Sequence, residues 1–191
     1  MNRRPPMRRL LFLTVLGCQG KPQDEPKPIP PAAIQVRDGT TAIAELRPTR
    51  PCRGTVGPVE LIVGGPPLVA TFGATQWTGA SGASGTTLSR DREAIARVYP
   101  VGAPAGAAVL DMNGVALVRI QVDGTTATVS NAAGVPFRKL TAAGTVIASD
   151  SPALTITGTS DLVLAALLSA PELQPELRIL AACERVLVKD P

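Results

Sequence analysis

Between residues 33 and 157 the chain alternates short apolar or β-branched runs with turn sequences, a pattern that restricts it to a mainly β fold. Pairs such as Asp38-Gly39 and Asp123-Gly124 join neighbouring runs, and such pairs favour tight hairpins between antiparallel strands. The 18 Gly and 19 Pro of the chain agree with this number of turns. We expect strands over residues 33–37, 41–46, 59–63, 68–75, 94–99, 115–122, 125–131, 135–140, 145–149 and 153–157.

The C-terminal residues follow a helical pattern instead. The Ser160-Asp161 pair can cap a helix that runs through Leu168, and Pro175 suits the first turn of a second helix through about Val188. Apolar side chains at helical spacing form one stripe on the second helix: Ile179, Leu180, Cys183, Val186 and Leu187. The fold class predicted is therefore mainly β (an antiparallel meander, sandwich or barrel-like sheet) with two short helices packed on it, or α+β if the helices count.

The N-terminal residues have the parts of an export signal. A basic segment, residues 1–9, precedes an apolar run, residues 10–16, and Gly17-Cys18 follow directly. As a helix the run is about 12 Å long, too short to span roughly 30 Å of hydrocarbon. Residues 15–18, Val-Leu-Gly-Cys, resemble the lipobox of bacterial lipoprotein precursors. Either Met1 or Met7 can serve as the start.

This resemblance implies cleavage after Gly17 and a diacylglyceryl group on the sulfur of Cys18. Two or three acyl chains make a stable anchor where one is marginal. Gln19 follows the cysteine, in place of the Asp that retains such proteins at the inner membrane of enteric bacteria. The resemblance thus implies an exported protein anchored at the outer membrane, facing the periplasm or the cell surface. The inner membrane stays the alternative, since the rule differs among bacteria.

Three segments follow from these observations: a signal peptide (1–17), a lipidated N-terminus with a proline-rich tether (18–32), and a single β-rich globular domain (33–191). The tether should adopt extended polyproline-like conformations, and at 3.1 Å per residue it reaches up to about 40 Å from the lipid surface. Its prolines are Pro22, Pro26, Pro28, Pro30 and Pro31.

The net charge of +4 lies in the signal segment. Removal of Arg3, Arg4, Arg8 and Arg9 leaves 15 basic and 15 acidic residues. A nucleic-acid binder needs a basic surface that displaces phosphate counterions, and a neutral mature chain gives little basis for one. We expect no nucleic-acid partner; the partners expected are membrane lipid, through the anchor on Cys18, and an envelope protein.

With Cys18 lipidated, two of the three cysteines remain. Cys52 is expected in a loop after the first hairpin, and Cys183 on the apolar stripe of the last helix. Because an exported chain meets an oxidising compartment, the even remainder favours a Cys52–Cys183 disulfide. Two unrelated buried thiols are the alternative.

The chain contains no histidine. Catalysis by Ser-His-Asp or Cys-His groups and the usual imidazole zinc sites are therefore excluded. Outside the tether the lysines are Lys139 and Lys189, and neither has a serine three residues before it, as a Ser-x-x-Lys arrangement requires. We expect a non-enzymatic protein with no cofactor and no metal site.

Two segments of the sequence are candidate ligand sites. Over residues 79–85 glycine recurs every third residue, which matches neither the dinucleotide fingerprint nor the P-loop. A mobile loop between strands is expected there, with a ligand-gating loop as the alternative. The Asp111-Met112-Asn113-Gly114 sequence lacks the later acidic ligands of a calcium loop and is expected to be a hairpin turn.

Trp77, next to the glycine-rich segment, is the one candidate for a ligand or partner contact, and core packing is its alternative interpretation. The function predicted is that of a membrane-anchored envelope lipoprotein acting as a binding or scaffolding module. The alternatives are a small-ligand carrier with a pocket between sheet and helices near Trp77, and a hydrolase that works without histidine. An apolar cavity of several hundred cubic ångströms would favour the carrier, and a solid core would contradict it.

Overall fold

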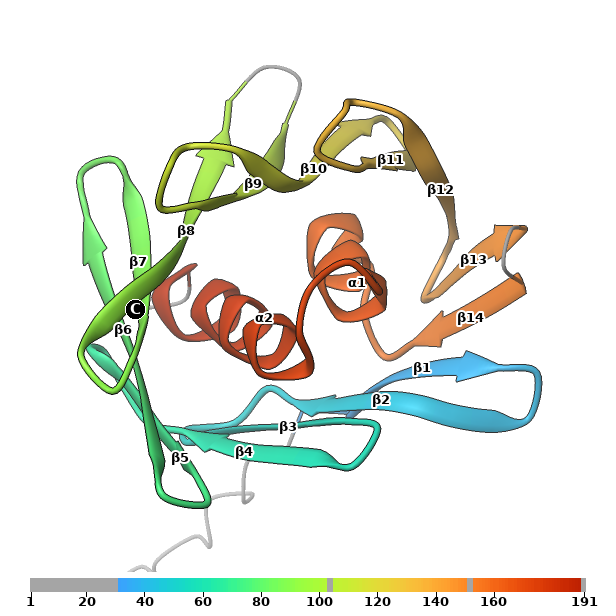
Figure 1. Cartoon of the computed structure of the whole chain (residues 1–191). Helices are drawn as coiled ribbons and strands as arrows, with labels where there is room; N and C mark the ends of the chain where they lie inside the picture. Colours follow the sequence, from blue (N-terminus) through green and yellow to red (C-terminus); the bar gives the residue numbers. More distant parts are fainter. Residues whose placement is uncertain (1–30, 103–104, 151–152, 190–191) are drawn as a thin grey trace, which may run out of the picture.

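The computed structural model describes residues 31–102, 105–150 and 153–189. The predicted signal peptide, the lipidation site Cys18 and nearly all of the tether lie outside the described residues. Strands make up most of the described chain (Figure 1). They are β1 (Ile34–Asp38), β2 (Thr41–Arg47), β3 (Cys52–Val56), β4 (Val59–Val63), β5 (Leu68–Phe72), β6 (Thr75–Gly82), β7 (Gly85–Arg90), β8 (Glu93–Val101), β9 (Gly106–Asp111), β10 (Ala116–Asp123), β11 (Thr126–Ser130), β12 (Pro136–Ala143), β13 (Val146–Asp150) and β14 (Ala153–Thr157).

All of these strands belong to one 14-stranded antiparallel sheet. Strands that follow one another in sequence pair, except β4 and β5, and β1 also pairs with β14, so the first and last strands lie side by side. The two ends of the sheet are β4 and β5, which meet through a bridge between Gly64 and Val69. The two backbone N···O distances of that bridge are 2.9 and 3.1 Å. The sheet is therefore nearly closed and barrel-like (Figure 1).

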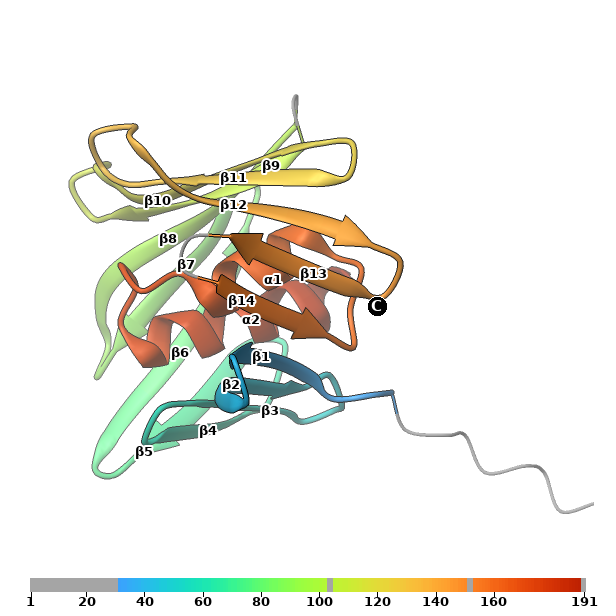
Figure 2. The same ribbon diagram turned by 90° about the vertical axis from the view of Figure 1, so that its right-hand side faces the viewer.

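The two helices, α1 (Leu162–Ser169) and α2 (Pro175–Lys189), lie inside this curved sheet (Figures 1 and 2). Every residue of α1 is buried, which explains why its sequence is apolar all round. The Asp161 side chain caps α1 by accepting from the backbone N–H groups of Val163 and Leu164 at 3.0 and 3.1 Å. The predicted fold class is confirmed, and the sheet encloses the helices rather than offering them one open face.

Strand periodicity explains which side chains face the helices. In β10, Val118 and Ile120 are fully buried, while the residues that follow each of them, Arg119 and Gln121, are exposed. The same alternation in the other strands lines the interior with Val, Leu, Ile and Ala. The core consists of this lining and the apolar sides of the two helices.

The expected mobile loop over residues 79–85 is wrong, because residues 79–82 and Gly85 belong to the paired ends of β6 and β7 and only residues 83–84 form the turn between them. Gly85 has a φ of +116°, and a Cβ there would collide with the carbonyl oxygen of Val98 on β8. Glycine at Gly79 and Gly85 allows the neighbouring strands β5 and β8 to approach closely. The placement of Cys52 in a loop is also wrong, since Cys52 is the first residue of β3.

The hairpin turn expected at residues 111–114 is confirmed. Asp111 Oδ1 accepts from the backbone N–H groups two and four residues later, at 2.9 and 2.8 Å. Asn131 repeats this arrangement 20 positions later in the sequence, at 3.1 and 3.0 Å. In both turns the side-chain oxygen accepts hydrogen bonds from backbone N–H groups that would otherwise lack a backbone partner.

Candidate ligand pocket

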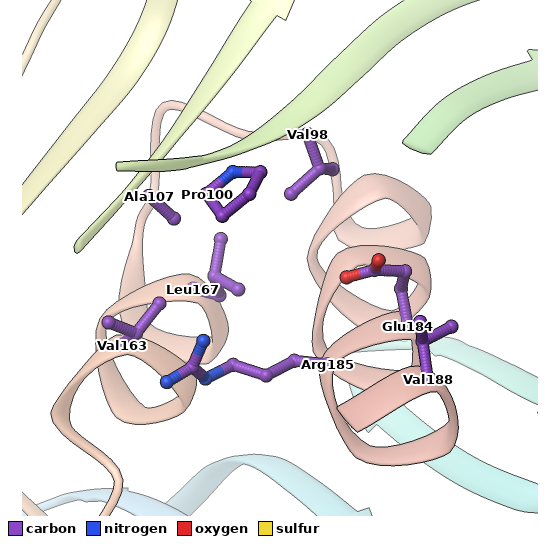
Figure 3. A pocket seen from close by; sticks show the side chains of 8 residues that line it. All are labelled: Val98, Pro100, Ala107, Val163, Leu167, Glu184, Arg185 and Val188. Atoms are coloured by element: carbon purple, nitrogen blue, oxygen red, sulfur yellow. The ribbon is translucent and has the colours of Figure 1, made fainter. Parts of the chain in front are cut away.

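A pocket of about 310 Å³ lies between the two helices and the hairpin of β8 and β9 (Figure 3). Such a volume is at the lower end of the range typical of small-molecule sites. Six of the eight lining residues are apolar and two are charged. The lining residues are Val98 and Pro100 from β8, Ala107 from β9, Val163 and Leu167 from α1, and Glu184, Arg185 and Val188 from α2.

The apolar wall follows from strand pairing and from the direction of the side chains. Pro100 and Ala107 are partners across the β8–β9 ladder, and Val98 lies two residues before Pro100 on the same face of its strand. Opposite them, Val163 and Leu167 are four residues apart on α1 and therefore share one face of that helix. Strand and helix faces thus enclose the pocket from two sides.

Glu184 is held in position by a hydroxyl relay from the sheet. Thr86 on β7 is 1% exposed, and its Oγ1 donates to Glu184 Oε1 at 2.7 Å. The Oγ of Ser81 on β6 lies 3.1 Å from the same Thr86 oxygen. Because Thr86 gives its one proton to the carboxylate, Ser81 acts as the donor in that second bond. The glycine-rich hairpin of β6 and β7 thus orients a charged side chain at the pocket.

Arg185, the next residue on α2, pairs with the residue that caps α1. Its Nε donates to Asp161 Oδ2 at 2.6 Å, and about a quarter of each side chain is exposed. The pair links the last turns of α2 to the N-terminus of α1 and fixes the spacing of the helices beside the pocket. In Figure 3 the guanidinium group of Arg185 reaches across the space between the helices toward Val163.

The three charged groups at the pocket leave one negative charge uncompensated. Arg185 is neutralised by Asp161, whereas among the described residues the hydrogen-bond partner of the Glu184 carboxylate is the hydroxyl of Thr86. No described cation lies within ion-pair distance of Glu184. The pocket therefore combines an apolar wall with a carboxylate that a hydroxyl orients and no cation neutralises.

Two arginines lie close together elsewhere in the interior. Arg138 on β12 is 5% exposed, and its Nη1 donates to the carbonyl oxygen of Ser169 at the end of α1. Arg178 on α2 donates from Nε to the carbonyl oxygen of Leu173 at 3.0 Å. Burial lowers the pKa of both guanidinium groups, and repulsion from Arg138 lowers that of Arg178 further, while Glu172 opposes both shifts. The Arg138 bond holds the end of α1 against the sheet, and the Arg178 bond ties the first turn of α2 to the segment that precedes it.

The residues predicted from the sequence to be functional or structural do not lie together in the structure. Cys52 and Cys183 form the predicted disulfide. Trp77 is 3% exposed in the core and is not among the pocket-lining residues, and its Nε1 has no hydrogen-bond partner in the described chain. The sequence reasoning missed Glu184 and Thr86. Their signal was weak, because a glutamate beside the apolar stripe and a threonine in a Gly/Ser/Thr run are common in solvent-facing positions.

Within the described residues, no three His, Cys, Asp or Glu side chains gather in a way that could hold a metal ion. The two described helices include none that is long and apolar enough to cross a membrane. Comparisons with protein-family models, with curated proteins and with solved structures give no match for this chain.

Proposed function

We propose that this chain is a membrane-anchored, non-enzymatic envelope lipoprotein whose β-rich domain binds a small, largely apolar molecule in the pocket between α1, α2 and the β8–β9 hairpin. The observation that carries the proposal is the pocket itself, about 310 Å³ with six apolar residues in its lining. Burial of apolar surface in such a site contributes about 25 cal/mol per Å². A ligand with little polar surface is therefore the one this lining favours.

The anchor is proposed from the sequence at residues 15–18 and from the proline-rich tether that follows. Metabolic labelling with a radioactive fatty acid tests it, with Cys18→Ser as the comparison. We expect label and membrane association in the wild-type protein and neither in the variant. An unlabelled wild-type protein would contradict the lipid anchor without affecting the pocket.

Ligand binding is tested with decanol, a neutral apolar probe, on the full chain carrying Cys18→Ser so that no attached lipid competes. Ala107→Leu places extra methyl groups in the pocket, and Ala108→Leu, at the next position of β9 and on the outer face of the sheet, is its matched control. Calorimetric titration should show binding to the parent and to Ala108→Leu, and at least tenfold weaker binding to Ala107→Leu. If Ala107→Leu folds poorly, Val188→Trp blocks the exposed mouth instead. Equal binding to blocked and unblocked proteins would contradict the proposal.

A second candidate function, scaffolding of an envelope protein, is supported by the opening between β4 and β5. In the described chain no ladder joins these two end strands beyond the Gly64–Val69 bridge, and the edge of a sheet can accept an extended segment of a partner as an added strand. Ile62 and Val69 flank the opening on the outer face and are 47% and 42% exposed. These side chains offer apolar contacts to a strand docked there.

Photo-crosslinking in native cells tests this candidate. A photoreactive residue is placed at Ile62 or at Val69, and at Val146 on β13 as a comparably exposed control position. We expect one envelope protein joined through position 62 or 69 and not through position 146. The same products from all three positions, or none, would contradict docking at the opening.

A further inference from the structure

The pocket holds a charge arrangement that restricts its ligand beyond apolarity. We infer that the molecule bound there is an amphiphilic cation, with an ammonium group against Glu184 and an apolar body between the helices and the β8–β9 hairpin. This inference rests on the proposed ligand-binding function. It adds the chemical class of the ligand.

The first support is the unequal pairing of the charges at the pocket. Arg185 pairs with Asp161 at 2.6 Å, whereas among the described residues the partner of Glu184 is a neutral donor, the hydroxyl of Thr86. An incoming cation meets, at a half-buried position, a carboxylate that no described cation neutralises. An incoming anion meets that same carboxylate and must compete with Asp161 for Arg185.

The second support is that the carboxylate is oriented before a ligand arrives. Ser81 and Thr86 form a relay of 3.1 and 2.7 Å that ends on Oε1 of Glu184, and Thr86 is almost fully buried. The side chain is therefore held at one place, and binding a cation there costs little side-chain entropy.

The third support comes from the strand side of the pocket. Arg97 and Tyr99 alternate with the lining residues Val98 and Pro100 on β8 and so point to the outer face of the sheet. Arg97 Nη1 donates to the hydroxyl oxygen of Tyr99 at 3.4 Å, which is consistent with this outer position. The strand wall thus brings no described cation toward Glu184, and the apolar body of a ligand contacts valine, proline and alanine there.

Three probes with the same alkyl chain separate the charge from the apolar body: decylamine, decanol and decanoate. They are titrated into the full chain carrying Cys18→Ser. We expect decylamine to bind about fivefold more tightly than decanol, the ratio that a partly exposed ion pair supplies, and decanoate to bind most weakly. Raising the salt concentration should reduce the preference for decylamine and leave decanol binding nearly unchanged.

Glu184→Gln removes the charge and keeps an acceptor for the Thr86 hydroxyl. This variant should bind decylamine and decanol equally. Glu176→Gln, at the start of the same helix and away from the pocket, is the matched control and should keep the preference. A thermal unfolding curve establishes whether each variant is folded. If Glu184→Gln does not fold, the ranking of the three probes on the parent protein still tests the inference.

The outcomes of the two proposals are distinguishable. Decanol that binds without a preference for decylamine, a preference for decanoate, or a preference that survives Glu184→Gln overturns the cation inference and leaves the ligand pocket standing. Decanol that does not bind, or whose binding is unaffected by Ala107→Leu, overturns both. Decylamine preference that Glu184→Gln abolishes and Glu176→Gln retains supports both.

Discussion

Cys52, the first residue of β3, is joined by a disulfide to Cys183 on α2, with Cα atoms 5.8 Å apart and 131 positions between the two residues in sequence. The same strand and helix approach closely a short way along, where a Cβ on Gly54 would overlap the Ile179 side chain. The disulfide therefore lies within a tight strand–helix contact. It fixes α2, and with it two charged residues of the pocket, to the N-terminal part of the sheet.

Removal of this disulfide should lower stability without changing the fold. In the chain-entropy relation a loop of this length contributes about 4 to 5 kcal/mol at most, by restricting the unfolded chain. We expect Cys52→Ser together with Cys183→Ser to lower the free energy of unfolding by about 2 to 5 kcal/mol, measured by urea titration. A reducing agent should destabilise the parent similarly and leave the double variant unchanged. An unaltered urea midpoint would contradict a stabilising role.

The disulfide, the β1–β2 hairpin and the hairpins from β10 to β14 could be predicted, because cysteines can be counted and turn residues are local signals. Two cysteines remain if Cys18 is assigned to the proposed lipid anchor, and pairs such as Asp38-Gly39 mark turns wherever they occur. The pairing of β1 with β14 could not be predicted, because strand register between distant segments depends on packing rather than on any local sequence. The strands β3, β6, β7 and β9 were not predicted. For β6 and β7 the reason is that Gly, Ser and Thr give them no apolar alternation.

The pocket could be predicted only in outline, as a space between sheet and helices. The sequence reasoning placed it near Trp77 because tryptophan is a frequent ligand contact. In the structure that side chain fills the core instead, and charges on α2 approach the pocket. Thr86 and Glu184 are hydrogen-bonded across 98 positions of sequence. Only the closing of the sheet around α2 brings them together.

Arg138 offers a test of the polar contacts in the interior. Arg138→Ala removes the donor to the Ser169 carbonyl oxygen and leaves a cavity beside the α1–α2 connection. Because a buried acceptor then lacks its partner, we expect a loss of about 2 to 4 kcal/mol in the free energy of unfolding. Lys139→Ala, at the exposed next position of β12, should change it by less than about 0.5 kcal/mol. Similar values for both variants would contradict a structural role for the buried guanidinium.

Two glycines flanking the β8–β9 turn should respond in opposite ways to alanine. A Cβ at Gly106 would collide with the carbonyl oxygen of Ile120, whereas a Cβ at Gly102 would meet no described atom within 4 Å. We expect Gly106→Ala to cost about 1 to 3 kcal/mol through overpacking. Gly102→Ala should be neutral or stabilise by up to about 1 kcal/mol by restricting the unfolded chain. Thermal unfolding of both variants measures the difference in their stability. A stabilised Gly106→Ala variant would show that β9 and β10 are less closely packed than the structure indicates.

Asp161 has two roles that a pair of substitutions can separate. Asp161→Asn keeps an N-cap for α1, because asparagine caps as well as aspartate, and it removes the charge that neutralises Arg185. Asp161→Ala removes both the cap and the charge and should cost about 1 to 2 kcal/mol of stability. In Asp161→Asn the three charges at the pocket become two opposite ones, so the preference for decylamine over decanol should fall toward unity while the thermal midpoint changes little. Calorimetric titration measures the ligand preference of each variant, and a thermal unfolding curve measures its stability. An unchanged preference for decylamine in Asp161→Asn would show that Arg185 has no influence on the ligand. A thermal midpoint of Asp161→Asn as low as that of Asp161→Ala would show that the carboxylate charge, rather than the cap, stabilises α1.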